Sequence, residues 1–166
     1  MSRGWEAVLE RMQVAPRDRI LVLGGADSAL TRQLAGLARD GLVLAVDASD
    51  EAVRQARRLS VQIDNLMFVL GSPDQIPWQE DFFTKLVGVF SEAWPDPKRA
   101  AGEIYRVLEP GGWAWLLEAP EHWAALLTMA GFDPVHPLRL SGDPPAWLLE
   151  AQEPPRPRYP ANRSLY

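Results

Sequence analysis

The sequence contains no cysteine. It therefore has no disulfide framework, no thiolate metal site and no thiol nucleophile. Histidine is scarce as well, and neither His122 nor His136 has a second ligand at metal-binding spacing. No serine, histidine and aspartate stand in the arrangement of a nucleophilic triad. The sequence thus predicts no metal site and no covalent catalysis through a thiol.

Long apolar runs and excess positive charge are also missing. No run reaches the length of a membrane span, and residues 1–6 lack the apolar core of a signal peptide. We therefore expect a cytoplasmic protein without a membrane partner. Lysine and arginine number 17 against 22 acidic residues, which gives a net charge of −5. This balance disfavours nucleic acid as a partner, although a local basic patch is compatible with it.

The composition is that of one globular domain. The 166 residues are 47% hydrophobic and are enough to bury a sizeable core. Proline (15) and tryptophan (7) are frequent, and the prolines concentrate toward the C-terminus. We predict a lead-in helix within residues 1–16, a domain over 17–153 and an extended, Pro/Arg-rich tail over 154–166. Such a tail can become ordered against a protein partner or a second copy of the chain.

The stretch from Arg19 to Asp47 organises the rest of the chain. Residues 20–23 are a short apolar run typical of a buried parallel strand, and residues 24–28 interrupt it with small side chains. A helix follows, then a second apolar strand over 42–46, with Asp47 at its end. This unit brings a helix N-terminus and a carboxylate to one crevice, where a nucleotide-type ligand can bind.

Two helices are predicted to face the core through regular apolar stripes. The first carries its stripe at Leu30, Leu34, Leu37 and Ala38 and stops at Gly41. The second begins at the capping residue Ser49 and carries its stripe at Ala52, Val53, Ala56 and Leu59.

The remaining chain continues the alternation of strands and helices. Strands are predicted over 66–70, 83–90, 113–117, 135–140 and 146–151. Helices are predicted after the Asp96-Pro97 start and over 120–130, with a stop at residues 109–112. Pro134 and Pro137 place the 135–140 strand at a sheet edge. The class is α/β with a mostly parallel sheet and an antiparallel strand from the final hairpin.

The order of these motifs resembles the class I S-adenosylmethionine-dependent methyltransferases, in the small-molecule branch near the ubiquinone/menaquinone methyltransferases. The resemblance covers about residues 17–152 and is carried by residues 20–35, 46–53, 68–78, 96–100 and 103–112. It implies a single Rossmann-like, doubly wound sheet of seven strands with helices on both faces. The last strand is expected to be antiparallel and to lie beside the fifth.

The resemblance also implies a cofactor and the residues that hold it. S-adenosylmethionine is expected at the ends of the first four strands, against Gly24, Gly25, Ala26, Asp47, Ala48, Ser72, Pro73 and Phe90. A nicotinamide enzyme is the competing interpretation, because an acid after the second strand also suits its ribose. That class expects a G-x-G-x-x-G turn, and this chain lacks both later glycines.

Several positions depart from the family's pattern. Val22 replaces an acid, Ala26 and Ser28 replace glycines, and Ser72 and Thr84 replace acids. A Cβ that obstructs the turn costs roughly 1–2 kcal/mol, and together these changes weaken cofactor binding by about 2–4 kcal/mol. Asp47 matches the ribose-binding acid, but it can equally form the turn and cap that precede the next helix.

Three further candidate site residues each allow a functional and a purely structural interpretation. Ile76 and Trp78 can sandwich an adenine or simply anchor their loop on the core. Glu92, after the fourth strand, is a candidate contact for the methyl acceptor and is otherwise a solvated carboxylate. Little sequence is left to cover the crevice, so we expect it to be shallow and open.

Two functions follow from the sequence. In the first, the chain is a methyltransferase-fold protein with an eroded S-adenosylmethionine site, weakly catalytic or non-catalytic, that acts through cofactor or partner binding. In the second, it is an active methyltransferase for a small-molecule acceptor. Methyl transfer itself requires alignment more than an acid or base, so the residues alone leave both open.

Overall fold

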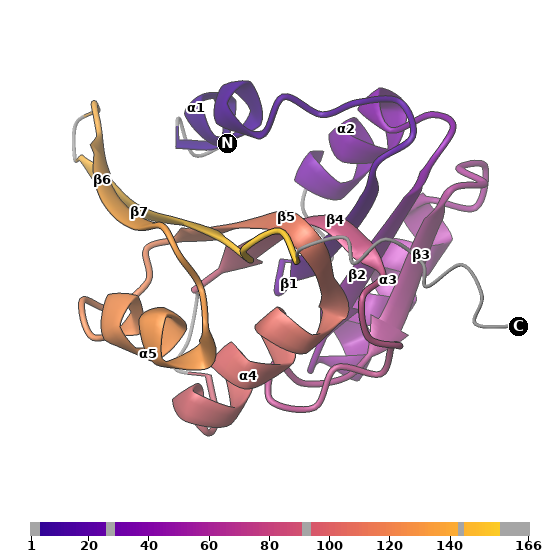
Figure 1. Ribbon diagram of the computed structural model, residues 1–166. Coiled ribbons are helices and arrows are strands. Elements are labelled where there is room, and N and C mark those ends of the chain that lie inside the picture. Colours follow the sequence, from indigo (N-terminus) through magenta and orange to yellow (C-terminus); the bar gives the residue numbers. More distant parts are fainter. Residues whose placement is uncertain (1–3, 26–28, 91–93, 143–144, 157–166) are drawn as a thin grey trace, which may run out of the picture.

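The computed structural model of the protein describes residues 4–25, 29–90, 94–142 and 145–156. A single seven-stranded sheet crosses the molecule in the order β3-β2-β1-β4-β5-β7-β6 (Figure 1). The strands are β1 (Arg19–Leu23), β2 (Leu42–Asp47), β3 (Leu66–Leu70), β4 (Phe83–Val89), β5 (Leu108–Leu117), β6 (Val135–Leu140) and β7 (Ala146–Gln152).

The sheet direction agrees with the sequence prediction. Strands β1 to β5 pair in parallel, whereas β7 is antiparallel to both of its neighbours, β5 and β6. The central strand β1 is almost wholly apolar and buried from Ile20 to Leu23, as a strand covered on both faces must be. β6 forms one edge, where Pro137 disrupts no inner ladder. The doubly wound α/β class is therefore confirmed.

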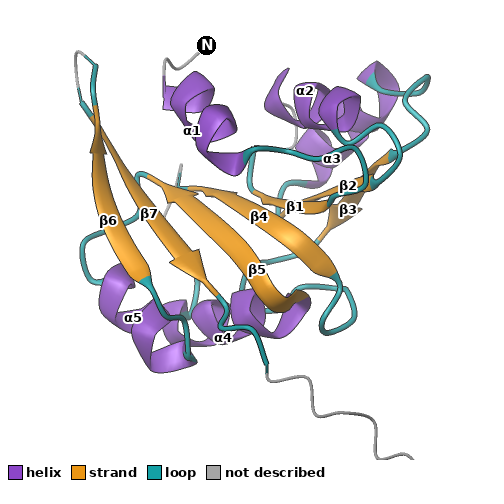
Figure 2. Ribbon diagram, turned by 45° about the horizontal axis from the view of Figure 1, so that its top comes forward, coloured by secondary structure: helices purple, strands orange, loops and turns teal. Residues whose placement is uncertain are grey.

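Helices cover both faces of the sheet (Figure 2). α1, α2 and α3 pack with one side of the central strands, and α4 and α5 pack with the other. None of these helices, within the part of the chain that the structure describes, is long and apolar enough to cross a membrane. Their bounds are α1 (Gly4–Met12), α2 (Ala29–Leu37), α3 (Asp50–Leu59), α4 (Pro97–Val107) and α5 (Trp123–Ala130).

The helix ends follow the local chemistry of the sequence. The Ser49 hydroxyl accepts a hydrogen bond from the Ala52 N–H at the start of α3. Asp96 does the same for the N–H of Arg99 at the start of α4. Gly131 ends α5 with φ +116°, a conformation that penalises any side chain.

Two residues predicted to be buried are exposed. Leu37 is 44% exposed and Leu59 is 60% exposed. Each is the last residue of its helix. The next residue along the chain, Ala38 or Ser60, is buried. The rest of both apolar stripes faces the core or its margin.

Two predicted boundaries were also wrong. β5 begins at Leu108, because residues 109–112 continue the strand instead of stopping it. The N–H of Gly111 donates to the carbonyl of Glu153, and the N–H of Glu153 donates to the carbonyl of Gly112. These bonds hold the glycine pair in the sheet, with Gly111 at φ +86°. α5 begins at Trp123, three residues later than Pro120.

Candidate functional site

The carboxyl ends of four parallel strands meet at one edge of the sheet. The N–H of Gly24, after β1, donates to Val46 O at 2.9 Å, and the N–H of Gly71, after β3, donates to Asp47 O at 3.0 Å. The N–H of Phe90, after β4, donates to Leu117 O at 3.2 Å. The ladder therefore fixes the first residue beyond β1, β3 and β4. Ligands of open α/β sheets bind at this edge.

The turn after β1 requires glycine. Gly24 has φ +76° and Gly25 has φ +64°. A Cβ on Gly24 would also lie 3.0 Å from Val89 O of the neighbouring strand. The predicted tight turn is thus present, and it lets backbone come close to a ligand. Ala26, the next predicted contact, lies outside the described residues.

Asp47 occupies the end of β2 and takes part in the turn into α3. Its Oδ1 accepts a hydrogen bond from the Ser49 N–H at 2.9 Å. The turn-forming role is therefore observed in the structure. The side chain is partly exposed at the crevice edge, so its position is compatible with the ribose-binding role, which stays a prediction.

A hollow of about 710 Å³ lies beside Asp47, at the ends of β2 and β3. It is lined by Ala48, Leu70, Gly71, Ser72, Gln75, Ile76, Pro77 and Trp78. Ile76 is only 3% exposed, and Trp78 packs edge-on against Phe82 with ring centroids 5.5 Å apart. These two residues anchor the loop on the core and also form a wall of the hollow. Pro73 is buried next to Ser72.

Glu103 and Arg106 of α4 hold this wall in place. Glu103 accepts the Ile76 N–H at 2.8 Å, and Arg106 donates to the carbonyl oxygens of Ile76 and Trp78 at 3.0 and 2.8 Å. Hydrogen bonds from Arg106 to Glu103 keep the pKa of the Glu103 carboxyl below its ordinary value despite burial. The sequence gives only a weak indication of this role, the oppositely charged pair Glu103 and Arg106 at i, i+3 on the amphipathic α4.

The acids missing from the sequence pattern are replaced by groups with structural roles. Val22 is fully buried in the core under α1, α2 and α3. The Ser72 hydroxyl donates to Asp74. The Thr84 hydroxyl donates to Asp18 at 2.9 Å and accepts the N–H of Arg19 at 3.0 Å. None of these three side chains supplies a carboxylate to the crevice.

The hydrogen bond from Thr84 to Asp18 has a structural role. Burial raises the pKa of the Asp18 carboxyl, but hydrogen bonds from Lys85, the Ala15 N–H and Thr84 outweigh burial and hold that pKa below the ordinary value. Thr84 thus belongs to an ion-pair network near the start of β4, whereas the crevice lies past the end of that strand.

An aromatic cluster lies past the end of β4. The rings of Phe90 and Trp94 are stacked with centroids 4.0 Å apart, and Trp123 meets them edge-on at 5.0 and 5.5 Å. Trp94 also packs over Gly88, where a Cβ would come within 2.8 Å of its ring. Phe90 was predicted as a cofactor contact, which stays a prediction, and the sequence did not single out Trp94. Glu92, the candidate acceptor contact, lies outside the described residues.

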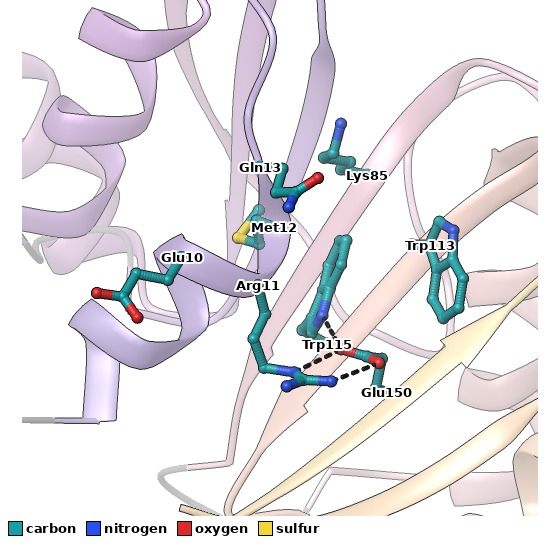
Figure 3. Close-up of a pocket in the computed structure, with 8 residues that line it drawn as sticks. All are labelled: Glu10, Arg11, Met12, Gln13, Lys85, Trp113, Trp115 and Glu150. Carbon is teal, nitrogen blue, oxygen red and sulfur yellow. Dashed lines mark hydrogen bonds and ion pairs between the residues drawn. The ribbon is translucent and has the colours of Figure 1, made fainter.

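A second hollow, of about 600 Å³, lies under the end of α1 (Figure 3). Three of the residues that line it bond to one another: Arg11 donates to both oxygens of Glu150 at 2.8 and 2.9 Å, and the indole N–H of Trp115 donates to the same carboxylate. These bonds, with Arg11 the largest cause, keep the pKa of Glu150 below its ordinary value despite burial. Lys85 and Trp113 place this hollow toward the start of β4 and β5, away from the carboxyl-end crevice.

The described residues contain no group of histidine and acidic side chains that could hold a metal ion. Among them, the glycine turn, the acid beyond β2 and the hollow at the end of β3 form one continuous edge. In doubly wound α/β proteins this edge of the sheet is where ligands bind, so the crevice is the candidate site.

Comparison with known proteins identifies the family. A family model described as a methyltransferase domain matches residues 21–116, which is more than half of the chain. The chain belongs to the class I S-adenosylmethionine-dependent methyltransferase family.

Individual relatives agree with this assignment. The chain is 31% identical over 124 residues to the ubiquinone/menaquinone biosynthesis C-methyltransferase UbiE of Pectobacterium carotovorum, covering 71% of this chain and 49% of that protein. It is 30% identical over 105 residues to 2-methyl-6-phytyl-1,4-hydroquinone methyltransferase 1 of rice, covering 63% of this chain and 31% of the relative. The matched part of the chain therefore spans only 31% to 49% of the length of these relatives.

The fold is matched by solved structures. A SAM-dependent methyltransferase from Aquifex aeolicus superposes with a TM-score of 0.76 at 17% identity, over 89% of this chain and 88% of that chain. At this identity the likeness supports the fold, not the substrate.

Proposed function

We propose that this chain binds S-adenosylmethionine or its demethylated product weakly, with the nucleoside at the end of β2 and β3. The observation that carries the proposal is the hollow that runs from Ala48 to Trp78 beside Asp47. Pro77 and Trp78 give the hollow a partly exposed apolar wall against which we place the adenine. Asp47 lies beside this wall, where its carboxylate would accept hydrogen bonds from the ribose hydroxyls. The residues present therefore fit the nucleoside half of the cofactor.

The same site has few polar groups that could bind the part of the cofactor beyond the nucleoside. Val22 is apolar, and the hydroxyl of Ser72 is engaged by Asp74 within the chain. When bound, the cofactor supplies a sulfonium methyl group for transfer to a nucleophile, a step that needs tight alignment. A loosely held cofactor aligns poorly, so we propose a weakly catalytic or non-catalytic protein that acts mainly through binding.

Replacing Asp47 by alanine tests the position of the nucleoside. We expect the Kd for S-adenosylhomocysteine to rise about tenfold, because a charged acceptor for the ribose hydroxyls is lost. The Kd is measured by titration followed by NMR, and thermal unfolding is followed in parallel. Asp50→Ala is the matched control, since the Asp50 side chain is exposed and pairs with Arg54 on the outer face of α3. If Asp47→Ala lowers stability and leaves affinity unchanged, Asp47 serves the turn alone.

Catalysis on a small-molecule acceptor is the alternative function. The partly exposed rings of Phe90 and Trp94 past the end of β4, backed by the buried Trp123, favour it because such a wall suits a flat, apolar acceptor. The relatives named for hydroquinone and quinone methylation are consistent with an acceptor of that kind. Transfer of a labelled methyl group from S-adenosylmethionine to a simple hydroquinone, at a rate that Trp94→Ala abolishes, would establish this function.

We also propose that the tail over 154–166 contacts a partner protein or a second copy of the chain. Its start is attached to the domain more firmly than expected for an extended tail, because Arg156 pairs with Asp81 at 3.2 Å and with Glu153 at 3.5 Å. The arginines and prolines that follow in the sequence suit extended contact with another chain.

Deleting residues 157–166 tests the tail and leaves the Arg156 attachment in place. We expect a change in oligomeric state by light scattering, or loss of a co-purifying protein, with an unchanged unfolding midpoint. Unchanged mass and unchanged co-purification would remove the proposed role.

A further inference from the structure

The geometry points to a docking surface for an extended, acidic segment of a partner protein along the outer edge of β3. We define this β3 edge surface by the exposed apolar residues of β3, of the turn before it and of the end of α3, together with three arginines of α3. Its members are Leu59, Val61, Met67, Leu70, Arg54, Arg57 and Arg58. The proposal does not depend on cofactor binding in the crevice, and the two sites share one residue, Leu70.

The apolar part of the surface is concentrated at one edge of the sheet. Four of the seven well-exposed large apolar side chains in the described residues lie on β3, in the turn leading into it or at the end of α3. Val61 is 79% exposed and Leu70 is 50% exposed. β3 is an edge strand, paired only with β2 in the described sheet. Exposed apolar side chains on an open strand edge are typical of a site for strand addition.

The backbone of β3 presents its outer hydrogen-bonding groups at alternate residues. Asn65 O and Gly71 N are bonded toward β2, through Val43 N and Asp47 O. In a parallel ladder the intervening odd positions also bond to β2, so the backbone groups of Leu66, Phe68 and Leu70 point outward. The N–H of Leu66 is already bonded to Ile63 O at 3.4 Å, so the outward groups of Phe68 and Leu70 and the Leu66 carbonyl are left for an added strand. Arg57 confirms this direction, because its guanidinium donates to the Phe68 carbonyl at 2.7 and 3.1 Å.

Arg57 makes the edge selective. In the free protein the Arg57 guanidinium is hydrogen-bonded to the Phe68 carbonyl, the central outward-facing acceptor of β3. A strand without a matching carboxylate would have to compete with this bond, so it is disfavoured. A carboxylate on an arriving strand can take over that guanidinium by a charge-assisted bond, which releases the Phe68 carbonyl to accept the strand's N–H. Arg54, Arg57 and Arg58, with Glu51, line a hollow of about 510 Å³ along α3. Arg54 is already paired with Asp50, so we place the arriving carboxylates against Arg57 and Arg58.

The positive charge of the α3 arginines indicates which kind of segment binds the β3 edge surface. A second copy docked about a two-fold axis would bring the arginines of α3 against themselves. The chain's own tail carries Arg156, Arg158 and Arg163, which have the same sign as this surface. A foreign acidic strand with apolar residues at alternate positions complements both the arginines and the exposed apolar side chains.

Titration with short peptides tests the proposal on the full chain. The probe is an eight-residue peptide of alternating glutamate and valine, followed by NMR shifts of the protein. We expect saturable binding with a Kd on the order of 100 µM and shifts confined to β3 and α3. Arg57→Glu should raise that Kd at least tenfold. Arg39→Glu, the same charge change at an arginine whose side chain is 74% exposed, should change it less than twofold.

Two peptide controls separate strand addition from simple attraction of charge. A lysine–valine peptide should not bind, and a glutamate–valine peptide with N-methylated central residues should bind at least tenfold more weakly, because it cannot donate to the Phe68 carbonyl. Equal binding by either control, shifts centred elsewhere, or no saturation below 1 mM would overturn the proposal.

Discussion

Replacing Ala26 and Ser28 together by glycine is expected to tighten the binding of S-adenosylhomocysteine about 30-fold. The family resemblance implies glycine at both places, in the turn expected to face the cofactor. Each Cβ removed from such a turn relieves about 1 kcal/mol, and two independent gains multiply to roughly 30-fold in Kd. Isothermal titration calorimetry of the variant against the unaltered chain measures this gain.

The control for that experiment is a second double-glycine variant. Ala125→Gly with Ser141→Gly makes the same chemical changes at exposed positions of α5 and the turn after β6. It should leave the Kd unchanged within about twofold, apart from a small loss of stability in α5. If the turn variant binds no better than this control, Ala26 and Ser28 do not limit affinity, and the account of an obstructed turn is wrong.

Replacing Glu153 by glutamine is expected to stabilise the protein by about 2–3 kcal/mol at pH 8. The Glu153 side chain is fully buried, and neither carboxylate oxygen has a hydrogen-bond partner in the described structure. Burial raises the pKa of this carboxyl from 4.5 to about 7; Arg156 opposes the rise and Asp81 adds to it. Above pH 7 the folded protein therefore carries a buried charge that glutamine removes.

The pH dependence follows from the direction of that shift. Between pH 4.5 and about 7 the folded chain binds the Glu153 proton and the unfolded chain does not, so the free energy of unfolding falls as pH rises through this window. The gain from Glu153→Gln should therefore be absent near pH 4.5 and complete above pH 8. Urea unfolding at several pH values measures it, with exposed Glu121→Gln as control. A gain of equal size at every pH would show that the carboxyl does not titrate in this window.

The sequence predicted most of the fold because its central strands are short, continuous apolar runs. Residues 20–23 and 42–46 can be buried only between two helical layers, and Pro137 confines β6 to an edge. The start of β5 was missed because Pro110, Gly111 and Gly112 have the composition of a turn. Their conformation is decided by hydrogen bonds to Glu153, which is distant in sequence and invisible to local patterns.

The site was less predictable than the fold. Gly24, Gly25 and Asp47 are adjacent to their strands, so local spacing places them at the crevice. The wall formed by Ile76 and Trp78 depends on Arg106, which reaches it from α4 across about 30 residues of sequence. Likewise, Trp94 covers Gly88 only because the chain folds back after β4. Such contacts depend on tertiary packing, which periodicity does not report.

The affinity of the unaltered chain for S-adenosylhomocysteine tests the central claim most directly. Our account holds that the scaffold for a sulfonium nucleoside is present while its polar contacts are depleted, so it predicts a Kd between about 100 µM and 1 mM by calorimetry. A Kd of about 10 µM or tighter that is lost in Asp47→Ala would contradict it and establish an intact cofactor site.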